Sequence, residues 1–309
     1  MTAFLFSGQG AQSAGMGKEL CESFPAARLV FERASDLLHR DIGKICFEGS
    51  IEELSLTANL QPALFTLSAA ALELLRSEGI TPAAAAGFSL GECSALYASG
   101  ILSFEDALAL VSRRAELMQS ACEQTNGAMY AILGLEDAVV EQTCAAIDGY
   151  VVPVNYNCPG QLVIAGEESA AESASQALLA AGASKAVKLN VSGGFHSELM
   201  ASAADEMLGF AKGLSYNKPA IPIYLNVTGE VMGDEVPDEY MPAYICRQMR
   251  SPVRFSSQIN AMLRDGVTAF AELGAGRTLC GFVKRISRDA KSCNVDSAKS
   301  FEAAMKMLG

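Results

Sequence analysis

The chain is poor in tryptophan, histidine and basic residues. Its 309 residues include no tryptophan, two histidines (His39 and His196), and 23 Lys and Arg against 35 Asp and Glu, for a net charge of -12. A protein that binds nucleic acid needs a basic surface, so this composition argues against one. No apolar stretch approaches the roughly 20 residues that cross a bilayer. Because Met1–Gly10 also lacks the basic start of a secretory signal, we expect a cytoplasmic protein without a membrane anchor.

Cysteine pairs at metal-binding spacing are also missing. None of the nine cysteines forms a C-x-x-C motif, so the sequence gives a zinc site no support, and we expect no metal. A disulfide framework would be unusual in so long a chain without an export signal. We therefore expect reduced thiols packed as small apolar side chains. The nine are Cys21, Cys46, Cys93, Cys122, Cys144, Cys158, Cys246, Cys280 and Cys293.

Apolar residues are abundant instead. Half of the residues are apolar and 19% are charged, which supports a large core and argues against disorder. At roughly 100–200 residues per domain, the length predicts about two domains. Residue spacing in the first part of the chain predicts a strand at Ala3–Phe6 and helices around Ala26–His39, Leu60–Arg76, Cys93–Ala98 and Phe104–Ala121.

The segment Ile80–Gly87 gives conflicting signals. Its four consecutive alanines favour a helix by intrinsic propensity. Pro82 interrupts that pattern, and the Gly-Phe-Ser-Leu-Gly run that follows requires a strand before it and a helix after it. We therefore predict a short buried strand here.

The middle of the chain has a different order of elements. Strand-like and helix-like segments alternate as β-α-β-β-α-β, the order of ferredoxin-like domains. The segments are Met129–Leu133, Ala138–Ile147, Tyr150–Tyr156, Gln161–Ala165, Ser169–Ala181 and Ala186–Val191. We predict a small ferredoxin-like domain at residues 127–191, inserted into a larger α/β domain formed by residues 1–126 and 192–309. The alternative is that these elements extend the main sheet.

The last third predicts further alternating elements. A helix is expected at Ser197–Lys212, a strand around Ile221–Val227 and a helix at Phe255–Arg264. A strand at Ala269–Leu273 would then open onto a final helix. The segment with Gly229, Gly233 and Pro237 is predicted to be a polar loop.

Gly87–Gly91 is the one match to G-x-S-x-G in the chain. A sharp turn from strand to helix crowds the backbone, and glycines on either side of the serine relieve that crowding. Ser89 would then project its hydroxyl at the mouth of the sheet. The N–H of Leu90 would lie at a helix N-terminus, where it can bind developing negative charge.

A serine hydroxyl needs a neighbouring base, which is usually histidine near neutral pH. His39 lies beside Arg40 and Asp41 on a charged helix edge and is predicted to be an exposed surface residue. His196 follows two glycines and precedes a helix, which suits a side chain aimed into a cleft. We therefore pair Ser89 with His196.

Gly8-Gln9-Gly10 follows the first predicted strand. It lacks the lysine of a phosphate-binding loop and the full dinucleotide fingerprint. A tight turn that aims a second N–H, from Gln9, at the site is the preferred interpretation.

Taken together, these motifs resemble the malonyl-CoA:acyl-carrier-protein transacylases along nearly the whole chain. The matching segments are Phe6–Gln12, Gln61–Ala63, Gly87–Glu92, Arg114 with Met118-Gln119, Asn155–Asn157, Gly194–Ser197 and Asn226–Thr228. The resemblance implies an α/β-hydrolase-like large domain with a ferredoxin-like insertion, and a free-standing enzyme of fatty-acid synthesis.

The resemblance also implies roles for single residues. Ser89 matches the nucleophile and His196 the base, and the N–H groups of Gln9 and Leu90 match the oxyanion hole. Arg114 matches the arginine that holds the malonyl carboxylate, a task that suits the planar guanidinium fork. By itself Arg114 would be interpreted as a solvated helix charge. Asn155 matches a polar residue near the active site.

The chain departs from the family pattern at several positions. Phe88 stands where the family usually has histidine before the nucleophile, which leaves the base to His196. Ser7 replaces a proline and Phe255 stands where tryptophan is common. In some relatives the residue matching Arg254 orients the catalytic histidine. An arginine side chain cannot accept a hydrogen bond, so only the backbone carbonyl of Arg254 could do so here.

The implied activity is transfer of a malonyl group from malonyl-CoA to the thiol of acyl carrier protein through a malonyl-Ser89 intermediate, without metal or redox cofactor. Phe195 resembles the malonyl-selective pattern, in which a bulky ring excludes an α-methyl branch. Because the chain is acidic, an acidic carrier protein requires a local basic patch. The candidates are Lys185, Lys188, Arg277, Lys284, Arg285 and Arg288. A serine acyl hydrolase, a polyketide malonyl transferase and a catalytically silent carrier-binding subunit are the alternatives.

Overall fold

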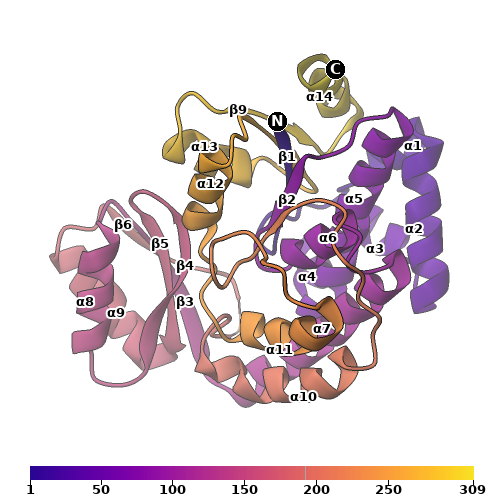
Figure 1. The fold of residues 1–309 in the computed structure, drawn as a ribbon. Helices are drawn as coiled ribbons and strands as arrows, with labels where there is room; N and C mark the ends of the chain where they lie inside the picture. Colours follow the sequence, from indigo (N-terminus) through magenta and orange to yellow (C-terminus); the bar gives the residue numbers. More distant parts are fainter. Residues whose placement is uncertain (192) are drawn as a thin grey trace.

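The computed structural model describes residues 1–191 and 193–309, and two β-sheets organise them (Figure 1). The larger sheet has five strands in the order β7-β2-β1-β8-β9. Every neighbouring pair in it is parallel. Its strands are β1 (Thr2–Phe6), β2 (Ala84–Gly87), β7 (Ile223–Tyr224), β8 (Ala269–Leu273) and β9 (Lys291–Val295).

Both faces of the parallel sheet are buried, which explains its continuous apolar strands. Successive side chains of β1 point to opposite faces: Phe4 and Phe6 join one core cluster, and Ala3 and Leu5 join another. The four alanines read as a possible helix lie in or beside β2, where small side chains fit between packed layers. The predicted short buried strand is therefore confirmed.

Helices cover the two faces of this sheet. On the Phe4 side the core includes α1 (Lys18–Ser23), α2 (Pro25–Leu38), α3 (Ile42–Phe47), α4 (Ile51–Ser55), α5 (Thr57–Ser77), α6 (Gly91–Ala98), α7 (Phe104–Gln124), α10 (Ala201–Ala211), α11 (Pro237–Met249) and α14 (Ala298–Leu308). On the Leu5 side lie α12 (Phe255–Arg264) and α13 (Thr278–Ile286).

The smaller sheet is antiparallel, in the order β4-β5-β3-β6. Its strands are β3 (Gly127–Leu133), β4 (Val151–Cys158), β5 (Gln161–Glu167) and β6 (Lys185–Lys188). Helices α8 (Asp137–Ala146) and α9 (Glu168–Ala180) cover one face, where Tyr130 and Ile164 are buried. Met129 and Val163 point the other way, into the core of the larger unit.

This topology confirms the predicted fold class, an α/β-hydrolase-like unit with a ferredoxin-like insertion. The strands of the small sheet all lie between Gly127 and Lys188, whereas the domain boundaries themselves stay a prediction. The boundary expected at residue 192 lies outside the described residues. The small sheet and its two helices stand at one side of the molecule, with both chain termini at the top of the view (Figure 1).

Some predicted elements were wrong. The expected polar loop contains helix α11, which begins at Pro237 and carries Asp238 and Glu239 in its first turn. Proline at the first helical position and acidic residues beside the helix N-terminus are both start signals. The helix predicted as the last one, α13, is followed by β9 and α14. Helix α10 is preceded by a 3-10 turn, η1 (Glu198–Met200).

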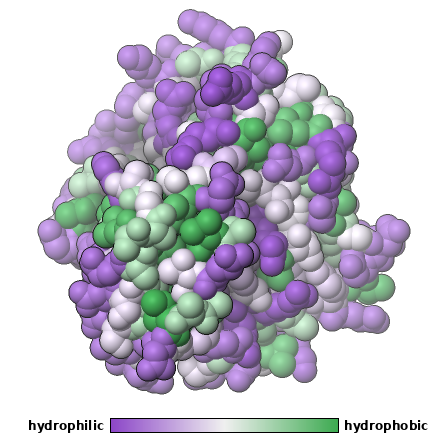
Figure 2. All heavy atoms as spheres, turned by 90° about the vertical axis from the view of Figure 1, so that its left-hand side faces the viewer, coloured by the Kyte–Doolittle hydropathy of each residue, from purple (hydrophilic) through white to green (hydrophobic). Residues whose placement is uncertain are grey.

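The helices, the surface and the cysteines can be compared with the expectations from composition. In the described part of the chain, no helix is both long and apolar enough to span a bilayer. On the face that carries the small sheet and its helices, apolar patches are separated by hydrophilic side chains (Figure 2). All nine cysteines are free, and all except Cys246 are buried.

Candidate active site

Ser89 lies at a sharp bend between β2 and α6. Its φ is +55°, a left-handed conformation that side chains other than glycine rarely adopt. A Cβ at Gly87 would overlap the backbone of Gly91, and a Cβ at Gly91 would overlap the carbonyl oxygen of Phe6. The two glycines of the G-x-S-x-G motif are therefore required by close backbone approach, and they leave the Ser89 hydroxyl at the carboxyl end of the sheet.

The structure brings His196 to this serine from the other half of the chain. Its Nε2 lies 2.6 Å from the Oγ of Ser89. Its Nδ1 lies 3.0 Å from the carbonyl oxygen of Gln248 and 3.1 Å from that of Ser251. Because carbonyls only accept hydrogen bonds, Nδ1 carries the proton and Nε2 is free to accept the proton of Ser89.

Burial sets the protonation state of His196. The imidazole is 2% exposed, and this burial, with the nearby Arg114 charge, lowers its pKa from 6.5 to about 4. The carbonyls of Gln248 and Ser251 oppose the shift, since they favour the protonated ring. His196 is therefore a neutral imidazole at pH 7, ready to act as a base.

Arg114 is a buried charge without an acidic partner. It lies on α7 and is 1% exposed. Its Nη1 donates to Gln61 Oε1 at 2.8 Å, and its Nη2 lies 3.3 Å from Gln248 Oε1 and 3.4 Å from Ser89 Oγ. Its Nε has no partner, and no carboxylate within the described residues lies at ion-pair distance. Buried charges are normally paired, so this guanidinium is suited to an anionic ligand.

The turn that contains Gln9 presses against the serine bend. A Cβ at Gly8 would overlap the carbonyl oxygen of Phe88, so the two backbones touch there. Leu90 adopts helical angles at the start of α6. Across the described residues, the N–H groups of Gln9 and Leu90 donate no backbone hydrogen bond outside helices and strands. Two unpaired donors beside a serine are what an oxyanion hole requires.

A cavity of about 180 Å³ opens beside this turn, between the two sheets. Ser7, Asn155, Asn157 and Glu272 line it, and within the described residues each carries a buried side-chain oxygen without a hydrogen-bond partner. Buried polar atoms without partners are costly, so four such residues beside one cavity mark it as a candidate binding site. Burial raises the pKa of the Glu272 carboxyl to about 7.

The remaining sequence-predicted residues take varied positions. Phe195 is buried directly before His196. The ring of Phe88 packs against the rings of Phe255 and Phe282, with distances between ring centroids of 5.7 Å and 6.2 Å. Phe88 therefore belongs to an aromatic cluster at the position where the family usually has histidine. His39 is exposed, as predicted, at the end of α2.

Arg254 does not orient the base. Its guanidinium lies over the ring of Tyr156, 5.4 Å from the centroid, and its carbonyl is not among the partners of His196 that the structure describes. The carbonyls of Gln248 and Ser251 take that task.

Gln248 is the functional residue that sequence reasoning missed. Its Nε2 donates to the carbonyl oxygen of Ser89 at 2.9 Å, and its Oε1 accepts from Arg114. Gln248 thus contacts Ser89, the buried Arg114 and, through its backbone, His196. Gln248 lies on α11, the helix that was not predicted from the sequence. It belongs to no recognisable sequence motif, so no signal in the sequence pointed to it.

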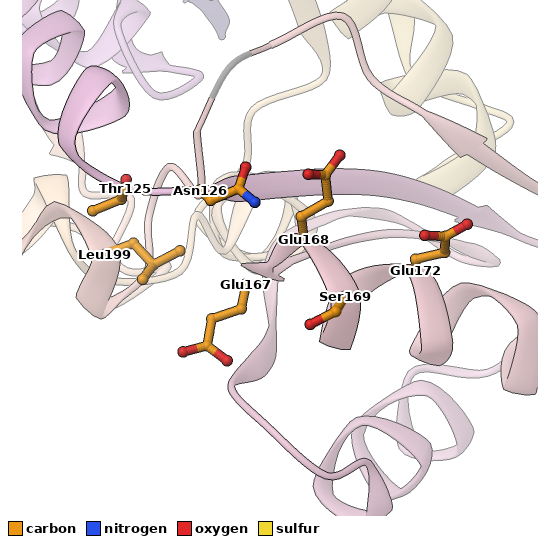
Figure 3. A pocket seen from close by; sticks show the side chains of 7 residues that line it. All are labelled: Thr125, Asn126, Glu167, Glu168, Ser169, Glu172 and Leu199. Carbon is orange, nitrogen blue, oxygen red and sulfur yellow. The ribbon is translucent and has the colours of Figure 1, made fainter.

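A larger cavity of about 580 Å³ lies away from this chemistry (Figure 3). Glu167, Glu168 and Glu172 line it, together with polar residues at the end of α7 and Leu199. It contains neither Ser89 nor His196, so its size does not mark the active site.

Comparison with known proteins gives one consistent family. A family model described as the acyl transferase domain matches residues 3–300. The malonyl CoA-acyl carrier protein transacylase of Bacillus subtilis (strain 168) is 42% identical over 309 residues, covering 99% of this chain and 96% of that protein. The enzyme of the same name from Escherichia coli (strain K12) is 38% identical, covering 99% of each.

Solved structures agree. A malonyl-transacylase in complex with its type II PKS acyl-carrier protein is 37% identical and superposes with a TM-score of 0.95, covering 99% of both chains. An acyl carrier protein S-malonyltransferase from Vibrio cholerae is 38% identical, with a TM-score of 0.92 over 98% of this chain and 99% of that one. With the predicted resemblance confirmed, the chain belongs to the acyl transferase family and, within it, to the malonyl CoA-acyl carrier protein transacylases.

Proposed function

We propose that this enzyme transfers a malonyl group from malonyl-CoA to the phosphopantetheine thiol of acyl carrier protein and so supplies fatty-acid chain elongation. The observation that carries this proposal is the buried guanidinium of Arg114, which lies 3.4 Å from the Ser89 hydroxyl and forms no ion pair within the described residues. A nucleophile, a base and a fixed positive charge within one site suit an acyl group that ends in a carboxylate.

In the first half-reaction, Ser89 Oγ attacks the thioester carbonyl while its proton passes to His196 Nε2. The N–H groups of Gln9 and Leu90 stabilise the oxyanion of the tetrahedral intermediate. The carbon–sulfur bond then breaks, and coenzyme A leaves as a thiol after taking the proton from His196.

In the second half-reaction the carrier's thiol gives its proton to His196 and attacks the malonyl-Ser89 ester. The same two N–H groups stabilise the second oxyanion. The carbon–oxygen bond to Ser89 breaks, and the serine recovers its proton from His196. This exchange uses only acid–base and nucleophilic chemistry and needs no metal or redox cofactor.

Arg114 selects the acyl group in this scheme. The malonyl carboxylate supplies the counter-ion that the guanidinium lacks, and its planar fork can donate two parallel hydrogen bonds. Phe195 precedes His196 in the chain and matches the malonyl-selective pattern, in which a bulky ring would leave little room for an α-methyl branch. A single methyl group is worth roughly 1–3 kcal/mol of discrimination, so selectivity for malonyl over methylmalonyl should be incomplete.

The cavity beside the Gln9 turn suits the arm of the substrate. A pantetheine chain carries amide groups, and the polar residues Asn155 and Asn157 belong to the lining of this cavity. Placing the arm in this cavity would leave its thioester end next to the two oxyanion donors.

The carrier protein would dock on a local basic patch. The patch proposed is Lys185, Lys188, Arg277, Lys284, Arg285 and Arg288. Arg285 donates to the carbonyl oxygen of Pro159 and to Gln161, and Gln161 lines the cavity. A relative solved with its acyl-carrier protein supports a carrier as the partner.

Steady-state kinetics with malonyl-CoA and varied carrier protein test the proposal. Parallel double-reciprocal lines and a malonyl-carrier product are expected. Release of free malonate without transfer would instead indicate a serine acyl hydrolase, and the absence of any coenzyme A release would indicate a silent carrier-binding subunit. Preference for a polyketide carrier over a fatty-acid carrier would reassign the pathway while leaving the chemistry unchanged.

A further inference from the structure

Three backbone groups of the serine bend are hydrogen-bonded to side chains from the second half of the chain. They are the carbonyl of Gly87 and both the N–H and the carbonyl of Ser89. Gln248 holds the Ser89 carbonyl, and Asn226 holds the other two groups. Gln248 also contacts Arg114 and His196 in the site described above, whereas Asn226 has no role in the proposed reaction.

Asn226 has complementary donors and acceptors for the bend. Its Oδ1 accepts from the Ser89 N–H at 2.8 Å, and its Nδ2 donates to the Gly87 carbonyl at 2.6 Å. Its side chain is 0% exposed. An amide is the side chain that can do both at once, since a carboxylate lacks the donor and an aliphatic chain lacks both.

Glu92 holds Asn226 in turn. Its Oε1 accepts from the backbone N–H of Asn226 at 2.7 Å and from the hydroxyl of Tyr244 at 2.7 Å. Burial raises the pKa of this carboxyl to about 7, so the neutral acid is a substantial form near neutral pH. Both recorded partners of Oε1 donate to it, so an uncharged amide oxygen at this place would serve as well.

The bend needs such support because Ser89 is held at φ +55°. A non-glycine residue in a sparsely populated conformation costs of order 1–3 kcal/mol and persists only where its surroundings impose it. Relaxation of the bend would move Ser89 Oγ away from His196 Nε2, and a misplacement of about 1 Å can cost roughly 100-fold in rate.

We propose that Asn226, held by Glu92 and Tyr244, is a positioning residue that keeps Ser89 in its reactive conformation by clamping the backbone on both sides of the nucleophile. It touches no substrate and acts through Ser89. The proposal deepens the proposed function and rests on Ser89 being the nucleophile of that reaction.

The test compares variants that keep or remove single hydrogen-bonding groups. Asn226→Ala removes the donor and the acceptor. Asn226→Asp keeps the acceptor and, in its ionised form, sets a carboxylate oxygen against the Gly87 carbonyl, so this variant is assayed at a pH where its carboxyl is ionised. Glu92→Gln keeps the Oε1 acceptor, whereas Glu92→Leu removes it. Gln258→Ala is the matched control, because Gln258 is also 0% exposed and also donates to a backbone carbonyl, that of Tyr224, at 2.7 Å.

Two readouts are measured at a temperature where each variant is folded by circular dichroism. The first is kcat and KM for malonyl transfer, and the second is the rate at which a fluorophosphonate labels Ser89. Both Asn226 variants and Glu92→Leu should lower kcat and labelling by about 100-fold with KM for malonyl-CoA nearly unchanged. Glu92→Gln should stay within about threefold of wild type.

The proposal fails if Asn226→Ala lowers labelling no more than Gln258→Ala does at a matched loss of melting temperature. It also fails if Glu92→Gln is as impaired as Glu92→Leu. If Asn226→Ala does not fold, Asn226→Asp and the Glu92 pair decide alone. A wild-type protein that is labelled at Ser89 but transfers no malonyl group would contradict the proposed function and leave the labelling comparison readable.

Discussion

The guanidinium of Arg114, a residue that is 1% exposed, lies 3.4 Å from the hydroxyl of the half-buried Ser89. His196 already serves as the base for Ser89, so deprotonation of the serine does not require an arginine. The burial of Arg114 is costly, and within the described residues only amide and hydroxyl oxygens accept its hydrogen bonds. The charge is therefore interpreted as part of substrate selection.

Arg114→Ala should reduce kcat/KM for malonyl transfer by about 100-fold or more, because the substrate carboxylate would be buried without a partner. Transfer of an acetyl group, which has no carboxylate, should change by less than about tenfold. The ratio of the two, measured with malonyl-CoA and acetyl-CoA, isolates the carboxylate contact.

The neighbouring Arg113 is the control for that experiment. It pairs with Glu116 and Glu206 on the surface, so Arg113→Ala should leave both rates near wild type. Equal losses of malonyl and acetyl transfer in Arg114→Ala would argue against the carboxylate contact.

The pH dependence of the reaction should reflect the lowered pKa of His196. The base must be neutral, so activity falls as pH drops through its pKa, which burial and Arg114 bring to about 4. We expect kcat/KM for acetyl transfer to be level from pH 8 to about 6 and to decline only below that range. In Arg114→Ala the nearby charge is gone, so the pKa of His196 and the acid limb should move to higher pH.

Profiles of kcat/KM for acetyl transfer in wild type and Arg114→Ala measure this shift directly. A wild-type acid limb at pH 6.5 or above would show that His196 titrates as an exposed histidine does.

The glycines of the serine bend should tolerate no side chain. Gly91→Ala would set a methyl group against the Phe6 carbonyl, and we expect unfolding free energy to fall by about 3 kcal/mol or more. In Gly209→Ala, on α10, the new Cβ meets nothing within 4 Å. That variant should gain about 0.5–1 kcal/mol from helix propensity.

Urea unfolding of the two variants and the wild type makes the comparison. A Gly91→Ala protein as stable as the wild type would show that the bend is looser than the structure has it.

Charge reversal in the proposed basic patch should change only the kinetics with the carrier protein. Lys284→Glu should raise KM for the carrier protein by about fivefold, more at low salt than at high salt, because rim charges mainly steer association. KM for malonyl-CoA in the first half-reaction should stay unchanged. Lys306→Glu, an equal charge reversal on α14, is the control, and equal carrier kinetics in the two variants would remove Lys284 from the patch.

The sequence predicted correctly those features that depend on a short local pattern of residues. Ser89 lies in a turn motif whose glycines are dictated by backbone crowding, and His196 could be singled out because the chain has only two histidines. The continuous apolar run Ala3–Phe6 likewise predicted the strand β1.

The sequence did not predict features that depend on contacts between residues far apart in the chain. Nothing in the sequence distinguishes Arg114 from Arg113 except family resemblance, and only the fold buries one of them. The groups that orient His196 are backbone carbonyls of Gln248 and Ser251, and a carbonyl leaves no trace in residue type. Helix α11 was missed because Pro237 was taken for a loop signal rather than for a helix start.

Intact-mass spectrometry after mixing the protein with malonyl-CoA tests the central claim most directly. The wild type should gain the mass of one malonyl group, and the added mass should disappear when carrier protein is supplied. Ser89→Ala should gain nothing under the same conditions. A malonyl adduct that persists in Ser89→Ala would contradict the assignment of the nucleophile and the mechanism built on it.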